Sequence, residues 1–143
     1  MSFAKKHIED GDYEDAVKAA TDAIEGGDAS PEPLFDRGTA LELLERYEEA
    51  VVDFERAIEK NAAVRELDPF ALDDAYFSAA LAAARAQAKA DLGGAVARLA
   101  RYREVLPEGA HAGESRDWEK RLRGELPSLL DKTRNVDGTS RER

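Results

Sequence analysis

Residues 32–58 read EPLFDRGTALELLERYEEAVVDFERAI, and this stretch decides how the rest of the chain is interpreted. Ser30, Pro31 and Pro33 mark the start of a helix, because serine caps helices and proline is tolerated in the first turn. Small or apolar residues then recur at helical spacing: Leu34, Gly38, Leu41, Leu44, Ala50, Phe54 and Ala57. Glycine inside a helix costs about 1 kcal/mol relative to alanine. We therefore predict two helices joined by a short turn, with close contact at Gly38.

The same pattern occurs earlier in the chain. Residues 11–16 read GDYEDA and residues 45–50 read ERYEEA, so that Ala16 and Ala50 are 50 − 16 = 34 residues apart. Tyr13 and Tyr47 have the same separation of 34 residues. A fixed period of this kind indicates stacked helical units. The earlier copy predicts a short helix over 3–10 and a second helix that Asp12 caps, with Asp15 in a capping-box arrangement, and that ends at Gly26-Gly27.

This period, with an aromatic residue in the turn and alanines at fixed offsets, resembles the tetratricopeptide repeat (TPR) family. The residues that match the family in the second unit are Leu34, Gly38, Leu41, Tyr47, Ala50, Phe54 and Ala57. The resemblance implies an all-α, right-handed α-solenoid of about three helix-turn-helix units with a C-terminal capping helix. It also implies the usual role of the family, which is to hold a partner protein or peptide.

The expected domain covers residues 1–131, with repeats at about 3–29, 30–69 and 70–108 and a capping helix at about 115–130. Residues 132–143 contain few apolar residues, and we expect a disordered polar tail there. Only ten residues precede Gly11, so the first helix lacks its start. An excised interaction domain of a larger protein therefore remains an alternative to a full-length chain.

The third unit departs from the period, because Ala50 and Ala95 are 95 − 50 = 45 residues apart. We expect the fourth helix to run about two turns past the usual end, toward Asp68-Pro69; an irregular linker over 61–72 is the alternative. Asp73-Asp74 is expected to cap a fifth helix over 75–91, and Leu92 takes the place of the tyrosine in the next turn. A seventh helix is expected to start at Ser115 or Asp117 and to carry Trp118 and Leu122.

Composition excludes several classes of function. The 143 residues include no cysteine, so disulfides and thiolate sites are impossible. The net charge is −10: residues 1–74 hold 8 basic and 21 acidic residues (−13), and residues 75–143 hold 13 basic and 10 acidic residues (+3). The acidic half would repel nucleic acid. No apolar run reaches the roughly 18 residues of a membrane span, and no signal peptide is evident, which favours a cytoplasmic location.

Motifs for catalysis, metals and cofactors are missing from the sequence. His7 and His111 have no partner at a metal-ligand spacing, and Gly93-Gly94 lacks the lysine of a phosphate-binding loop. None of the serines lies in a Gly-x-Ser-x-Gly motif. We therefore expect a non-enzymatic protein without a metal or cofactor.

The TPR resemblance implies that the first helix of each repeat lines a concave groove that binds an extended or helical peptide. By matching offsets, the candidate positions are Lys5, Ile8, Phe35, Asp36, Thr39, Glu42, Leu43, Phe77, Leu81, Ala84, Gln87 and Ala88. Phe35 and Phe77 are the expected anchors, since aromatic residues dominate binding energy at interfaces. The alternative is that Phe35, Phe77 and Leu81 pack against a neighbouring helix.

One type of TPR site does not fit this chain. Co-chaperone TPR domains grip a C-terminal carboxylate with lysine, arginine and asparagine side chains. The corresponding positions here hold Asp36, Phe77 and Leu81, which repel a carboxylate or offer it no donor. Only Lys5 lies near a clamp position, which is asparagine in the family.

The sequence therefore predicts a protein–protein interaction module with a peptide or helix of a partner protein in its groove. The alternative is a structural or assembly protein that self-associates, for example as a homodimer, through its N-terminal edge. There a short first helix would leave Ala16, Val17 and Ala20 undercovered, and exposed apolar patches usually mark interfaces.

Overall fold

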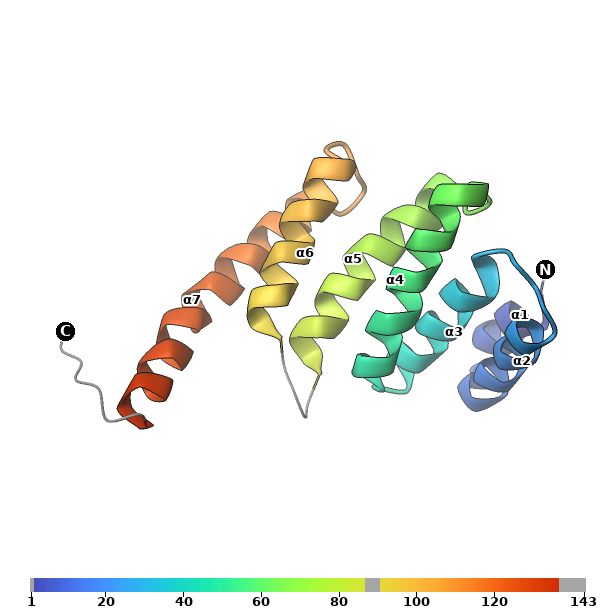
Figure 1. The fold of residues 1–143 in the computed structure, drawn as a ribbon, viewed down its shortest axis with the longest axis horizontal. Helices are drawn as coiled ribbons and strands as arrows, with labels where there is room; N and C mark the ends of the chain where they lie inside the picture. Colours follow the sequence, from blue (N-terminus) through green and yellow to red (C-terminus); the bar gives the residue numbers. More distant parts are fainter. Residues whose placement is uncertain (1, 87–90, 137–143) are drawn as a thin grey trace.

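The computed structural model describes the backbone of residues 2–86 and 91–136 and the side chains up to residue 124. Every regular element in these ranges is a helix (Figure 1). The helices are α1 (Phe3–Glu9), α2 (Tyr13–Glu25), α3 (Glu32–Leu43), α4 (Tyr47–Val64), α5 (Pro69–Arg85), α6 (Leu92–Val105) and α7 (Ala112–Val136). Within the described residues, no helix has the combination of length and hydropathy that a membrane span requires.

The helices follow one another in space as they do in the chain (Figure 1). Each helix packs against the next one, and α3 also contacts both α1 and α5. This arrangement of α1–α2, α3–α4 and α5–α6 pairs is an all-α solenoid, which confirms the predicted fold class. Helix α7 follows α6 and occupies the position of the first helix of a further pair.

The turns inside the three pairs are equivalent, as the repeat predicts. Tyr13, Tyr47 and Leu92 are the first residues of α2, α4 and α6. The expected caps are partly wrong, because neither Asp12 nor Ser30 accepts a capping hydrogen bond through its side chain. Asp12 precedes α2 without such a bond, and Pro31 takes the position before α3. Gly27 ends the turn after α2 with a φ of +97°, a conformation that favours glycine.

Close contact between α3 and α4 explains the glycine in the middle of α3. A Cβ atom built on Gly38 would lie 3.0 Å from two ring carbons of Phe54. Ala50 is fully buried and Phe54 is 1% exposed. Small residues in one helix therefore make room for the aromatic ring of the other, as the sequence pattern predicts.

The prediction of a lengthened fourth helix is confirmed, since α4 runs to Val64. Asn61, the first residue of the alternative linker over 61–72, lies inside this helix and is buried. Its Oδ1 atom accepts a hydrogen bond from the backbone N–H of Leu67 at 2.9 Å. The irregular linker is limited to residues 65–68, where Arg65 adopts the left-handed conformation with a φ of 54°.

The predicted start of the fifth helix is wrong. Helix α5 begins at Pro69 rather than at residue 75, because Asp68 accepts a capping hydrogen bond from the N–H of Ala71 at 2.9 Å. Proline fits the first helical position, where its missing N–H has no intrahelical partner to lose. Asp73 and Asp74 consequently lie within the helix rather than at its cap, and the helix ends at Arg85 rather than at residue 91.

The last helix also differs from the prediction at both ends. Helix α7 begins at Ala112, so Ser115 lies in its first turn, where the hydroxyl donates to the carbonyl oxygen of Ala112 at 2.8 Å. The helix continues to Val136, so residues 132–136, expected in a disordered tail, are helical. The expected tail over 137–143 lies outside the described residues.

Two clusters form the core of the solenoid. One surrounds Phe54 and contains Leu41 and Ala79, and it joins α3, α4 and α5. The other surrounds Tyr102 and Leu99 and extends to Leu122, which joins α5, α6 and α7. The clusters share Val51 at their borders, so the apolar interior is continuous along the stack.

Candidate functional site

The first helices of the pairs form one side of the solenoid. Helix α3 contacts α1 and α5 directly, and α7 takes the next position along the stack. We call the surface of α1, α3, α5 and α7 the first-helix face. It is the surface on which the sequence predicts a binding groove.

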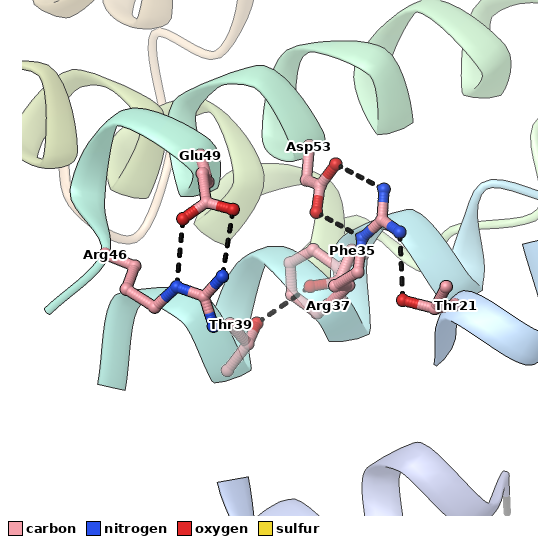
Figure 2. Close-up of polar contacts among 7 residues, drawn as sticks. All are labelled: Thr21, Phe35, Arg37, Thr39, Arg46, Glu49 and Asp53. Atoms are coloured by element: carbon pink, nitrogen blue, oxygen red, sulfur yellow. Dashed lines mark hydrogen bonds and ion pairs between the residues drawn. The ribbon is translucent and has the colours of Figure 1, made fainter. Parts of the chain in front are cut away.

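The central part of the first-helix face lies on α3. Leu43 is 47% exposed, and Thr39 and Phe35 are half-buried. The ring of Phe35 packs against Phe54 with centroids 5.9 Å apart, and the hydroxyl of Thr39 donates to the carbonyl oxygen of Phe35 at 3.0 Å (Figure 2). Phe35 thus contributes to the core and to the surface, while Leu43 offers the larger free apolar area.

One ion pair and one hydrogen bond of Arg37 connect α3 to its neighbours α4 and α2 (Figure 2). Arg37 donates from Nε and Nη2 to both carboxylate oxygens of Asp53 on α4, at 2.7 and 3.0 Å, and from Nη1 to the hydroxyl of Thr21 on α2 at 3.1 Å. Bidentate pairs of this kind fix orientation as well as distance. Arg46 pairs with Glu49 at the start of α4 in a similar way, but this second pair is exposed.

Glu42 adds a partly buried carboxyl group to the same surface. Burial raises the pKa of Glu42, the charge of Arg85 on α5 lowers it, and Asp74 raises it again. The net pKa is above the ordinary value. Glu42 and Arg85 therefore interact across the boundary between α3 and α5, on the first-helix face.

Lys5 and Ile8 lie on α1 and are half-buried. Asp36, in contrast, is only 2% exposed, and its Oδ2 atom accepts a hydrogen bond from the Ser2 hydroxyl at 3.1 Å. Asp36 therefore faces the junction of α1 and α3 rather than open solvent. The junction of the first and second repeats thus offers fewer freely exposed residues than the sequence predicts.

The structure does not leave Phe77 and Leu81 free for a partner. They are 6% and 8% exposed and belong to the core cluster around Tyr102. The ring of Phe77 also stacks on His111, with centroids 4.3 Å apart and an angle of 6° between the planes. The alternative of packing against neighbouring helices therefore holds for both residues. Gln87 and Ala88 lie outside the described residues, and Ala84 is half-buried at the end of α5.

An aromatic and basic group lies at the C-terminal end of the face, where sequence reasoning expected only a capping helix. The ring centroid of Trp118 on α7 is 5.7 Å from the Cζ atom of Arg85 and 4.2 Å from that of Arg121. These distances allow cation–π interaction. The repeat order could have predicted this group, because α7 follows three pairs of helices. The first helix of a fourth unit would contribute residues to the same surface.

His111 joins α5 to α7 through a network of hydrogen bonds. Its Nε2 atom lies 3.0 Å from Asp74 Oδ1, and its Nδ1 atom lies 2.9 Å from Glu114 Oε1. The neighbouring Asp73 accepts from the hydroxyl of Tyr102 and from the N–H of Ala110, both at 2.8 Å. Burial lowers the pKa of His111, but the bonds with Glu114 and Asp74 outweigh it and the net pKa is raised. These hydrogen bonds connect α5 to the start of α7, and we call the group that makes them the His111 network.

Neither a protein-family model nor a curated protein matches the chain. Among solved structures, the chain is similar to the TPR2B domain of yeast Sti1, described as a TPR2B-domain:pHsp70 complex. The TM-score is 0.64 at 24% identity, and the match covers 85% of this chain and 91% of that one. The chain therefore has a TPR-like fold.

Proposed function

We propose that this protein is a non-enzymatic interaction module that binds a peptide or helix of a partner protein on the first-helix face. Three features of the described residues support this proposal. Leu43 is exposed on α3, two guanidinium groups on α5 and α7 lie within 6 Å of the Trp118 ring centroid, and Glu42 provides a partly buried acid near Arg85. Apolar anchors among a few placed charges are typical of peptide-binding surfaces.

The observation that carries the proposal is the continuity of this surface over α3, α5 and α7. The charge of Arg85 acts on Glu42 on one side, and its guanidinium contacts the ring of Trp118 on the other. A bound segment could therefore reach an apolar residue, an acid and a basic aromatic group in turn. The solved TPR2B domain of yeast Sti1 was found in a complex with pHsp70, which supports a peptide ligand for a domain of this fold.

The test uses peptides selected from a random display library on the intact protein. Affinities are then measured for the wild type and for the variants Leu43→Ser, Trp118→Ala and Val52→Ser. Val52 is the matched control, because it is an aliphatic residue that is 53% exposed but lies on α4, outside the first-helix face. We expect Leu43→Ser and Trp118→Ala each to weaken binding at least tenfold, which corresponds to about 1.4 kcal/mol.

Val52→Ser should bind the selected peptides as the wild type does. Peptides that bind all four proteins equally, or that lose affinity only with Val52→Ser, would place the binding surface elsewhere and contradict the proposal. Circular dichroism at the measuring temperature checks that each variant is folded.

Self-association through the N-terminal edge has less support in the structure than in the sequence. Ala16 is fully buried and Ala20 is 1% exposed, because α1 covers them despite its short length. The exposed apolar residue at this edge is Phe3, which is 80% exposed. Light scattering of the wild type and of Phe3→Ser over a range of concentrations tests the alternative: a dimer that Phe3→Ser dissociates would favour it, and a monomer throughout would exclude it.

A further inference from the structure

A cavity of about 370 Å³ lies at the junction of α1, α2 and α3. The start of α1 and the start of α3 form two of its sides, and the C-terminal half of α2 forms the third. The residues that matter for its chemistry are Ser2, Phe3, Ala19, Ala23, Glu32 and Asp36. This site is separate from Leu43 and Trp118, on which the proposed function rests.

The walls of the cavity are mainly apolar. Three alanines of α2, Ala19, Ala20 and Ala23, lie on one side, and Phe3, although 80% exposed, also lines the cavity. Alanine methyl groups leave the space that larger side chains would fill. Such walls suit a narrow aliphatic chain, which gains from leaving water at about 25 cal/mol per Å² of apolar surface.

The polar side chains of the cavity are three carboxylates, Asp28, Glu32 and Asp36, and the hydroxyl of Ser2. Asp36 is 2% exposed, and the only hydrogen bond recorded for its carboxylate among the described residues is the one that Oδ2 accepts from Ser2. A buried carboxylate is ordinarily satisfied by several donors or by a paired cation, because removing it from water is costly. The Oδ1 atom of Asp36 has no such partner within the described part of the chain.

The surroundings of Asp36 leave its charge poorly compensated. Burial raises the pKa of Asp36 to about 6, against the lowering effect of the Ser2 hydrogen bond, and the charge of Glu32 raises it further. The charge of Lys5 lowers the pKa of Asp36 and is the smallest of the effects that act on it. No ion pair between described residues includes Asp36, Glu32 or the third carboxylate of the cavity, Asp28. The cavity thus has acceptors and negative charge in excess.

We propose that this cavity binds an alkylammonium group, an aliphatic chain that ends in a primary ammonium. The ammonium would donate to the free oxygen of Asp36 and to Glu32, and the chain would lie along the alanines and Phe3. An ammonium is a compact charge with three donors on a flexible stem, which fits a small pocket with carboxylates at one end. A lysine side chain of a partner protein and a free aliphatic amine share this chemistry.

The experiment follows the methyl NMR signals of Ala19, Ala20 and Ala23 during titration with butylammonium chloride at pH 7.5 and constant ionic strength. At this pH Asp36 is ionised and the amine, with a pKa of about 10.4 like that of lysine, is protonated. Butan-1-ol serves as the neutral ligand of the same shape. We expect saturable shifts with butylammonium and at least tenfold weaker binding of butan-1-ol.

Two variants distinguish the effect of the carboxylate charge from that of the cavity volume: Asp36→Asn tests the charge, and Ala19→Leu tests the volume. Asp36→Asn keeps the shape and removes the charge, and Glu59→Gln is the matched control on an exposed position of α4. Asp36→Asn should bind butylammonium at least tenfold more weakly, and Glu59→Gln should bind as the wild type does. Ala19→Leu fills the cavity without changing any charge and should also abolish binding, so the test remains decisive if Asp36→Asn fails to fold.

Absence of saturable shifts in the wild type would overturn the proposal, as would equal binding of butan-1-ol or undiminished binding by Ala19→Leu. N-acetyl-lysine N-methylamide and 1,5-diaminopentane then distinguish the sources. Binding of the lysine derivative identifies a partner's side chain, and binding of the diamine alone identifies a free amine. These signals arise on α2, so their outcome is independent of the peptide test on Leu43 and Trp118.

Discussion

At the scale of single residues, burial of Asp36 shifts the pKa of its carboxyl group to about 6. It lies buried beside Ser2, with Glu32 and Lys5 as the charged residues that act on it. A buried carboxyl group with a raised pKa is held more stably as the neutral acid. Its ionisation at neutral pH therefore works against folding.

This position gives a pH-dependent prediction. The pKa of Asp36 is about 6 in the folded protein and 3.8 in the unfolded reference, so the folded state binds the proton more tightly between these values. The stability that this group contributes is present below pH 3.8 and is lost as pH rises through about 6. The shift corresponds to at most about 3 kcal/mol.

Urea denaturation of the wild type and of Asp36→Asn at pH 4.5 and pH 7.5 measures this effect. From pH 4.5 to pH 7.5, the free energy of unfolding of the variant should rise relative to that of the wild type by about 1 to 3 kcal/mol. The other carboxyl groups, including Glu42, are common to both proteins and cancel in the comparison. A difference between the two proteins that does not change with pH would contradict the assigned environment of Asp36.

At the scale of helices, the contact between α3 and α4 depends on the absence of a side chain at Gly38. A methyl group there would meet the Phe54 ring at 3.0 Å. Because overpacking in a filled core costs about 1 to 3 kcal/mol, Gly38→Ala should destabilise the protein by this amount despite the better helix propensity of alanine.

Gly124→Ala is the matched control for this prediction. Gly124 lies within α7, is exposed, and would bring its Cβ within 4 Å of no other group. That variant should be neutral or more stable by up to about 1 kcal/mol. The two free energies of unfolding are compared by urea denaturation, and equal effects of the two changes would show that α3 and α4 do not pack as described.

The junction of α5 and α7 should respond to pH in its own way. His111 is positioned between Asp74 and Glu114, with Asp73 and Tyr102 in the same network. Its net pKa is raised above 6.5, so its stabilising charge is present below pH 6.5 and is lost as pH rises through the folded pKa. Relative to His111→Gln, the wild type should lose thermal stability between pH 6 and pH 8.5, as measured by calorimetry. If the difference in melting temperature between the two proteins does not change with pH, the His111 network does not stabilise the charged imidazole.

The sequence predicts the helices of the first two units well, because Gly38, Tyr47 and Ala50 repeat a pattern that depends on local contacts. It misplaces the start of α5, since Asp68-Pro69 can end one helix or begin the next, and only the capping bond to Ala71 decides. The offsets of the TPR family place Phe77 and Leu81 on the predicted groove, whereas both are buried in the core, as the alternative of packing against a neighbouring helix predicts.

The partners of Asp73 could not be predicted for a related reason. Tyr102 and Ala110 lie far along the chain from Asp73, and no local pattern indicates such contacts. The sequence predicts Trp118 on a capping helix. Its proximity to Arg85 follows only from the position of α7 beside the preceding units. The sequence therefore does not predict those groups of the candidate site that only tertiary packing brings together.

At the scale of the whole molecule, the two sides of the solenoid consist of different helices. One side presents α2, α4 and α6, and the other presents the first-helix face. Because each unit contacts mainly its neighbours, a ligand that spans several units should stabilise them together. Binding on the first-helix face should therefore protect α3, α5 and α7 as a group.

Hydrogen–deuterium exchange with and without a selected peptide measures this protection. We expect slower exchange in α3, α5 and the described part of α7 around Trp118, with little change in α2 and the exposed side of α4. Protection concentrated on α2 and α4, with α3 and α7 unchanged, would contradict binding on the first-helix face.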